Sequence, residues 1–231
     1  MIQPPADLSC RLCRTSGGEP FYQDNRDYFR CPVCHLVFVP PDQFLSPQEE
    51  KAEYDQHNNS PDDPHYRRFL RRLLDPLSEC LAPNSCGLDF GSGPGPTLSV
   101  MLEEAGHNME IFDPFYAPKN EVLQQQYDFI TATEVLEHLH HPCRELDRLW
   151  ACLKPSGLLG IMTKRVIDQQ AFSRWHYKSD PTHVCFFSIE TFGWLATHWC
   201  AGWTLPEKDV VLFTKPASLQ QPSTASFTHR S

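Results

Sequence analysis

The run LDFGSGPG over residues 88–95 constrains the fold of this chain most strongly. It begins inside an apolar segment, Cys86–Phe90, that predicts a buried strand. Three glycines follow at alternate positions: Gly91, Gly93 and Gly95. Glycine lets the backbone turn sharply and approach a ligand closely, and open α/β sheets bind ligands at the carboxyl ends of their strands. We therefore expect a ligand site here, although Pro96 replaces the third glycine of the dinucleotide pattern G-x-G-x-x-G.

Strand and helix patterns alternate along the chain from residue 85 onward. Apolar runs predict strands at 86–90, 109–113, 127–132, 158–163 and 210–214. Apolar residues at helical spacing predict helices at 65–81, 97–105, 143–153 and 188–199, and one more that follows the third strand through Glu137. Strands that alternate with helices build a mostly parallel sheet. We therefore predict an α/β fold with a Rossmann-like, mostly parallel sheet and helices on both faces.

Four cysteines near the N-terminus have the spacing C-x2-C-x17-C-x2-C: Cys10, Cys13, Cys31 and Cys34. Two short knuckles can each present two thiolates, and together they close a tetrahedron around zinc. The alternative, four unrelated buried thiols, is disfavoured because so short and polar a segment has no core to bury them in. Four sulfur ligands leave no position for water, so the zinc would be structural. We predict a small zinc ribbon over residues 1–39.

Composition limits the partners and the compartment of the protein. The 231-residue chain has a formal net charge of −9, which gives no long-range attraction to nucleic acid or to an anionic membrane. The first ten residues lack the basic and apolar regions of a signal peptide, and no apolar run reaches the length that spans a membrane. We therefore expect a cytoplasmic protein without membrane contact, whose other cysteines are mostly buried thiols.

Residues 85 to 214 resemble the class I S-adenosylmethionine-dependent methyltransferases. The glycine loop, preceded by an acid, is similar to the first motif of that family. The run YDFITATEVLEHL at 127–139 resembles its fourth strand and following helix, and LKPSGLL at 153–159 resembles the turn before its fifth strand. The resemblance implies that this chain is a transferase that uses S-adenosylmethionine, and that residues 85–214 form the methyltransferase domain.

The same resemblance implies which residues contact the cofactor. The residues that would line the methionine and ribose portion of the cofactor are Asp89, Gly91, Gly93 and Gly95. Asp113 ends the second strand, where it would hold the ribose hydroxyls. The residues between this strand and Tyr127, PFYAPKNEVLQQQ, are too few for both the usual third strand and its helix. The adenine-binding residues are therefore not carried over.

An acid–histidine cluster follows the third predicted strand. Glu134, Glu137 and His138 share one face if a helix begins near Glu134. Two carboxylates and an imidazole are typical ligands of Mg²⁺, Mn²⁺ or Zn²⁺. The E-x-x-E-H run is similar to that of ubiquinone-pathway O-methyltransferases and small-RNA 2′-O-methyltransferases, where it contributes to a divalent-metal site. His183 is the candidate for a further ligand from the segment after the strand at 158–163.

The cluster also has an interpretation without metal. Similar runs occur in methyltransferases that bind no metal, where the acid and the histidine orient or hydrogen-bond their neighbours. In that case His138 or His183 would act as a general base. The sequence leaves both interpretations open. In either case the catalytic candidates are Glu134, His138 and His183.

The chain divides into four predicted segments: the ribbon at 1–39, a linker with a helix at 40–84, the methyltransferase domain at 85–214 and a disordered tail at 215–231. We expect O-methylation of a small hydroxylated molecule, with the ribbon as a lid or docking module. Two alternatives stay open: an RNA methyltransferase that docks RNA on the ribbon, and a non-catalytic scaffold for a protein partner. The acidic balance, with basic residues clustered only at Arg67–Arg72, favours the small molecule.

Overall fold

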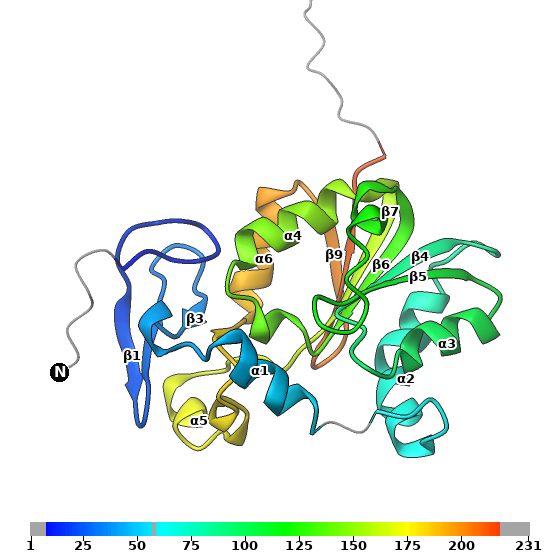
Figure 1. Cartoon of the computed structure of the whole chain (residues 1–231). Helices are drawn as coiled ribbons and strands as arrows, with labels where there is room; N and C mark the ends of the chain where they lie inside the picture. The colour runs from blue at the N-terminus through cyan, green and yellow to red at the C-terminus, as the bar shows by residue number, and fades with distance from the viewer. Residues whose placement is uncertain (1–7, 57–58, 218–231) are drawn as a thin grey trace, which may run out of the picture.

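The computed structural model describes residues 8–56 and 59–217. They form a six-stranded sheet flanked by helices and a four-stranded sheet near the N-terminus (Figure 1). Most of the tail that the sequence predicts to be disordered, 215–231, lies outside the described residues. Within them, no helix is long and apolar enough to cross a membrane.

The larger sheet has the strand order β5-β4-β6-β7-β10-β9. Its strands are β4 (Cys86–Phe90), β5 (Asn108–Phe112), β6 (Tyr127–Thr133), β7 (Leu153–Met162), β9 (Gly202–Glu207) and β10 (Val210–Thr214). The first four run parallel, and β10 pairs antiparallel with both β7 and β9. The predicted mostly parallel sheet is confirmed, whereas β9 is a strand that the sequence pattern did not predict.

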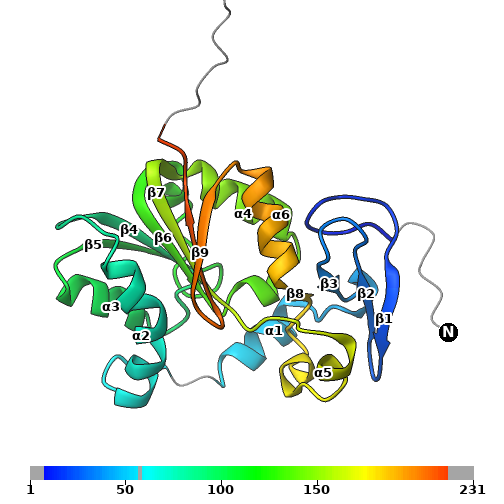
Figure 2. The ribbon, with the colours of Figure 1, turned by 180° about the vertical axis from the view of Figure 1, so that it is seen from behind.

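Helices cover both faces of this sheet (Figures 1 and 2). They are α2 (Pro64–Ser78) and α3 (Thr97–Glu104) on one face, and α4 (Pro142–Ala151) and α6 (Ile189–His198) on the other. Alternate residues of strand β10 pack against the helices on opposite faces of the sheet. Val210 and Leu212 pack with the leucines of α2, whereas Val211 and Phe213 join the core under α4 and α6. This division follows from the alternation of side chains along a strand.

Shorter elements connect the layers: η1 (Pro41–Gln43), α1 (Pro47–Tyr54), η2 (Asn120–Gln124), η3 (Leu136–His138), α5 (Gln169–Ser173) and η4 (His176–Ser179). Helix α1 starts with a capping box, in which the side chains of Ser46 and Glu49 each accept a hydrogen bond from the other's backbone N–H. Only η2 lies between β5 and β6 in this fully described stretch, so the usual third strand is missing and β5 is an edge strand.

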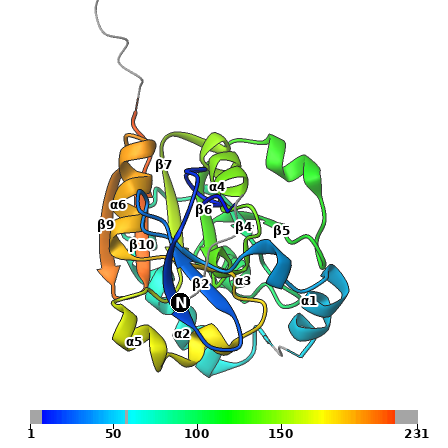
Figure 3. The same ribbon diagram turned by 90° about the vertical axis from the view of Figure 1, so that its left-hand side faces the viewer.

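The cysteine-rich module, defined here as residues 8–39, is not a separate body. It forms β1 (Glu19–Gln23), β2 (Asp27–Arg30) and β3 (Val37–Phe38). A fourth strand, β8 (Cys185–Phe186), completes its sheet in the order β1-β2-β3-β8. Because β8 lies between β7 and α6 in the chain, the module pairs directly with the larger domain; Figure 3 shows the module from the front.

The module also shares its apolar core with that domain. The ring of Tyr28 meets Phe172 edge-on at 5.0 Å and Phe186 at 5.9 Å. Phe29 and Phe38 are likewise fully buried. A segment this short cannot enclose such large side chains alone, so the larger domain covers them. The module therefore packs as part of the larger domain, and the boundary predicted at residue 39 stays a prediction.

Candidate active site

The glycine loop after β4 adopts backbone conformations that favour glycine. Gly91 has a φ of +76° and Gly93 a φ of +65°, in the left-handed region that other residues rarely adopt. A Cβ atom on Gly91 would also lie 2.4 Å from the side chain of Val135, and one on Gly95 would lie 1.7 Å from the carbonyl oxygen of Asn59. The loop therefore requires glycine at all three positions, for φ, for space or for both.

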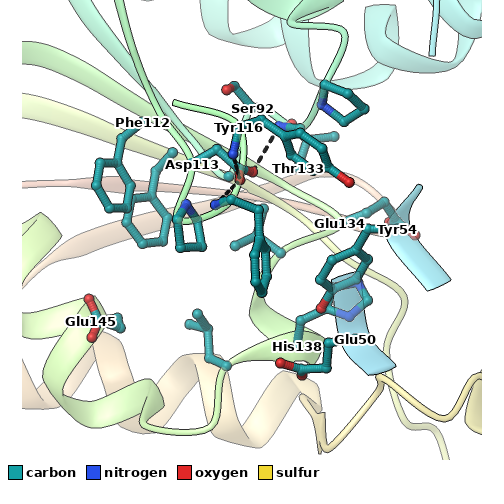
Figure 4. Close-up of a pocket in the computed structure, with 18 of the residues that line it drawn as sticks. Glu50, Tyr54, Ser92, Phe112, Asp113, Tyr116, Thr133, Glu134, His138 and Glu145 are labelled. Atoms are coloured by element: carbon teal, nitrogen blue, oxygen red, sulfur yellow. Dashed lines mark hydrogen bonds between the residues drawn. The ribbon is translucent and has the colours of Figure 1, made fainter. Parts of the chain in front are cut away.

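Asp113 follows β5 and ties the glycine loop to the next turn. One carboxylate oxygen accepts the backbone N–H of Gly93 at 3.0 Å. The other accepts those of Phe115 at 2.8 Å and Tyr116 at 3.0 Å (Figure 4). A carboxylate offers about four acceptor positions, so three amide bonds leave capacity for another donor. Asp113 lines the cavity described below, where a ribose hydroxyl could supply that donor.

Asp89 has a different environment from Asp113. It is 4% exposed and accepts hydrogen bonds from the hydroxyls of Thr131 at 2.8 Å and Ser99 at 3.1 Å. Burial raises the pKa of Asp89 to about 6, although both hydroxyls act to lower it. Neither Asp89 nor Gly95 is among the residues that line the cavity. Both are sequence-predicted cofactor residues, and their contact with the cofactor stays a prediction.

A cavity of about 790 Å³ extends from the glycine loop to the acid–histidine cluster. Gly91, Gly93 and Asp113 line one end, and His138 and His183 line the other. Helix α1 contributes Glu50 and Tyr54 to its wall. Figure 4 shows these two side chains beside His138, away from Phe112 and Asp113. The sequence-predicted cofactor and catalytic regions thus share one cavity.

The chain does not form the predicted helix after β6. Glu134 has a φ of +51°, and only the 3-10 turn η3 follows it. A left-handed residue cannot begin an α-helix, so Glu134, Glu137 and His138 do not share a helical face. The two carboxylates converge by another route. The Tyr177 hydroxyl donates to Glu137 Oε1 and lies 3.3 Å from Glu134 Oε2.

The Glu134–Glu137 pair holds a proton more tightly than ordinary carboxyls do. Glu137 is fully buried and also accepts the Thr163 hydroxyl at 2.9 Å. Burial, and after it the neighbouring Glu134 carboxylate, raise the pKa of Glu137 to about 8. Burial raises the pKa of Glu134 as well. Two close carboxylates resist joint ionisation, so the pair carries a proton near neutral pH.

His183 is oriented by the backbone of its own loop. Its Nδ1 lies 2.7 Å from the carbonyl oxygen of Tyr177, and only an N–H can pair with a carbonyl. Nε2 therefore carries a lone pair in the neutral ring. It lies 3.7 Å from a carboxylate oxygen of Asp180, and the ring centre lies 4.6 Å from that of His138. Burial lowers the pKa of His183, which favours the neutral form.

Three of the four predicted ligands of a divalent ion come together. Ligand atoms of Glu137, His138 and His183 lie within 4.8 Å of one another, whereas Glu134 is outside this group. An Nδ1–H bound to a carbonyl is the arrangement that presents Nε2 of a histidine to a metal. A set of one carboxylate and two imidazoles also leaves positions open, as catalytic metal sites require. These residues therefore fit a divalent ion.

The four N-terminal cysteines also gather at one point. Their Sγ atoms lie within 4.8 Å of one another, with 3.4 Å between Cys10 and Cys34 and between Cys13 and Cys31. Tetrahedral zinc with Zn–S bonds of about 2.3 Å requires sulfurs about 3.8 Å apart. The cluster therefore fits a structural zinc ion, which would hold the two knuckles together without contacting the cavity.

Sequence reasoning missed several residues at the end of the cavity lined by His138 and His183. Glu50 and Tyr54 belong to a segment that reads as a polar linker, and Asp180 lies in the segment of His183 without being singled out. Glu50 accepts a hydrogen bond from His140, 2.8 Å away, and the Tyr54 ring packs edge-on against His138. The one available signal was the capping box before α1, which marks a real helix in the linker.

Comparisons with known proteins agree with this geometry. A family model described as a methyltransferase domain matches residues 63–205. A proposed sarcosine dimethylglycine methyltransferase from Galdieria sulphuraria is 15% identical, with a TM-score of 0.50 over 67% of this chain and 86% of its own. The 1,6-didemethyltoxoflavin-N1-methyltransferase of Burkholderia thailandensis is 16% identical, with a TM-score of 0.48 over 85% and 99%. No curated protein matches the chain in sequence.

The Galdieria structure supports the fold alone, whereas the family match covers more than half of this chain. The matched residues include the glycine loop, Asp113, both histidines and most of the residues that line the cavity between them. The chain therefore belongs to the methyltransferase domain family and is an S-adenosylmethionine-dependent methyltransferase.

Proposed function

We propose that this enzyme transfers a methyl group to a hydroxyl of a small molecule. The observation that carries the proposal is the single cavity that joins the glycine loop to His138 and His183. Its volume of about 790 Å³ lies in the range typical of small-molecule sites. One cavity can therefore hold a cofactor at one end and a small acceptor at the other.

The cofactor end would bind S-adenosylmethionine through the backbone of Gly91 and Gly93 and through Asp113, which would accept the ribose hydroxyls. The cofactor supplies an electrophilic methyl group on a sulfonium. Asp89 and Gly95 would keep the loop in shape rather than touch the ligand. What the protein adds is the alignment of the acceptor oxygen with the methyl group and the exclusion of water.

Residues at the acceptor end would accept the proton of the acceptor hydroxyl. His183 is kept neutral by burial and presents Nε2 as a proton acceptor, with His138 beside it at the cavity wall. Glu134 also lines the cavity and would orient the acceptor. If a divalent ion is bound, Glu137, His138 and His183 would hold it, and it would stabilise the oxyanion as a Lewis acid.

The charges around the cavity favour a small acceptor over RNA. Its wall includes the acids Glu50, Asp113, Glu134, Glu145 and Asp180 but only two arginines, Arg144 and Arg148. The basic cluster on α2 is largely neutralised, because Arg67, Arg71 and Arg72 pair with Glu104, Asp75 and Asp209 respectively. Phosphates would therefore meet neither a basic cavity nor an unpaired basic helix.

Methyl labelling tests the proposal. The enzyme is incubated with S-adenosylmethionine labelled in its methyl group, and with either a small-molecule extract or total cellular RNA. We expect label in the small-molecule fraction, with the product stable to conditions that cleave methyl esters. We also expect EDTA, at a level that spares the cysteine site, to slow transfer and Mg²⁺ or Mn²⁺ to restore it. Label in RNA alone would overturn the small-molecule assignment, and full activity in EDTA would leave the histidines as bases only.

A further inference from the structure

The turn between β1 and β2 forms hydrogen bonds with the backbone of the loop that carries His183. Arg26 of this turn donates through Nη1 to the carbonyl oxygens of Pro181 at 3.0 Å and His183 at 2.9 Å. Through Nη2 it donates to the carbonyl oxygens of Asp180, at 3.0 Å, and Lys178. One guanidinium group therefore binds four carbonyls of a single loop. Guanidinium is planar and rigid, so these contacts fix the path of that backbone.

Residues of this turn and of β2 hold the start of the loop. The Tyr28 hydroxyl donates to the carbonyl oxygen of Lys178 at 3.2 Å. The ammonium group of Lys178 pairs with Asp24, and its side chain is 9% exposed in that pair. Lys178 thus binds the module through its backbone and through its charge. Helix α5, which precedes the loop, also lies against β1 (Figure 2).

The module holds the other end of the loop as well. Val39 donates its N–H to the carbonyl oxygen of Val184 at 3.0 Å, and β3 pairs with β8 directly afterwards. On its opposite side, Val184 donates to the carbonyl oxygen of Glu137 at 2.8 Å. His183 therefore lies on a short backbone segment fixed by the module at both ends and joined to Glu137 of the candidate site.

We infer that the cysteine-rich module is a structural part of the active site, and that Arg26 is a positioning residue that sets the place and the ring orientation of His183. The inference rests on the proposed function, in which His183 acts on the acceptor. Its physical basis is that the Tyr177 carbonyl receiving His183 Nδ1 and the clamped carbonyls belong to one short loop. When Arg26 is removed, the loop loses four donors and its carbonyls turn to water, so Nδ1 loses its fixed partner.

This role differs from that of a lid or docking module for substrate. Arg26 binds the backbone carbonyls of the loop and is absent from the cavity wall. Its effect on the reaction is therefore indirect, through the loop that carries His183. The zinc site would also help to hold this part of the module in place. Cys31 directly follows β2 and Cys34 precedes β3, the strands on either side of the second knuckle.

The test compares Arg26→Ala, Arg26→Lys and a control, Arg30→Ala, in the whole protein. Arg30 lies in β2, and no side-chain hydrogen bond from it to residues 177–183 is found among the described residues. Three quantities are measured: the ¹⁵N signals of the His183 ring, the Kd for S-adenosylhomocysteine, and the initial rate of label transfer from S-adenosylmethionine to the small-molecule extract.

We expect Arg26→Ala to replace the single His183 tautomer by an exchanging mixture and to slow transfer about a hundredfold, the scale of a displacement of about 1 Å. The Kd for S-adenosylhomocysteine should stay near the wild-type value, because the glycine loop makes no contact with the turn. Added guanidinium chloride at low millimolar concentration should restore part of the rate in Arg26→Ala. Arg26→Lys should retain part of it, and Arg30→Ala should match the wild type.

The outcomes separate this inference from the proposed function. If Arg26→Ala keeps the wild-type His183 signals, or keeps its rate while His183→Ala loses activity, the positioning role is wrong. If the wild-type enzyme labels no small molecule, the proposed function fails, and the His183 signals still decide whether Arg26 sets the ring. If Arg26→Ala does not fold, Arg26→Lys provides the comparison, and wild-type signals and rate in that variant would contradict the inference.

Discussion

The two ends of the cavity are built in different ways. The cofactor end comes from one continuous stretch, in which the loop at 91–95 and Asp113 hold each other through the Gly93 amide. The acceptor end combines η3, the loop before β8, and α1, and it is held in place by the N-terminal module. A local motif can thus be read from sequence almost completely. For a site assembled by long-range contacts, the sequence indicates which residue types take part but not which residues hold them in place.

Loss of zinc should produce the largest difference between the two ends. A structural zinc site contributes folding free energy on the order of 10 kcal/mol. We expect Cys31→Ser to lose the metal and to lose hydrogen-exchange protection at 8–39 and also at 177–187, while β4–β7 stay protected. Elemental analysis and exchange mass spectrometry measure both effects, with the exposed Cys80→Ser as control. Unchanged protection at 177–187 in a metal-free variant would mean that the module does not support the acceptor end.

Removal of the histidine at the acceptor end should mainly affect turnover. General base catalysis is worth about 10²–10⁴-fold in rate, so His183→Ala should slow methyl transfer by that factor. S-adenosylhomocysteine should still bind, because His183 does not contact the glycine loop. The matched control is His176→Ala, an exposed residue of η4 whose ring lies 3.4 Å from Lys164. Weaker cofactor binding in His183→Ala would show that the two ends are not separate.

The stability of the folded protein should depend on pH through Asp89, in the strand that leads into the glycine loop. Burial raises its pKa from 3.8 to about 6 in the folded state. Between these values the unfolded chain loses this proton while the folded protein keeps it, so stability falls as pH rises. Against Asp89→Asn, which cannot ionise, the wild type should lose about 3 kcal/mol across this window. Urea unfolding at several pH values measures it, and parallel profiles for the two proteins would refute the buried-acid account.

Asp113→Asn should weaken the cofactor end without disturbing the acceptor end. Loss of charge-assisted hydrogen bonds to ribose hydroxyls costs about 2 kcal/mol, or about thirtyfold in Kd for S-adenosylhomocysteine. The control is Glu110→Gln, an exposed residue of the same strand. Calorimetry measures the Kd, and the His183 ring signals report on the acceptor end. Equal affinity in Asp113→Asn and wild type would remove Asp113 from the cofactor site.

The same contrast explains what the sequence could and could not predict. Strand β4 and a connection before Tyr127 too short for both the usual third strand and its helix follow from local patterns, and the structure shows both. The helix expected at Glu134 does not form, because packing of Glu137 beneath Tyr177 outweighs the local helical spacing. Arg26 lies in a polar turn with no periodic signal, and its role depends on carbonyls more than 150 positions away in the chain.

The strands of the module illustrate the same limit. Its cysteine spacing predicts the cluster that the structure shows. Nothing in residues 1–39 indicates that β8 completes the sheet, since Cys185–Phe186 is a two-residue strand inside a loop. Pairing between such short and distant segments is decided by the shared aromatic core around Phe172 and Tyr28, which no single window of the sequence contains.

A crystal structure with S-adenosylhomocysteine, with anomalous data at the zinc edge, would show both ends of the cavity at once. We expect ribose hydroxyls on Asp113, the ligand's sulfur facing the end of the cavity that holds His138 and His183, and one zinc among Cys10, Cys13, Cys31 and Cys34. The Arg26 guanidinium should still hold the loop before β8. A ligand bound away from the glycine loop, or a sulfur that faces away from the two histidines, would mean that the proposed site is wrong.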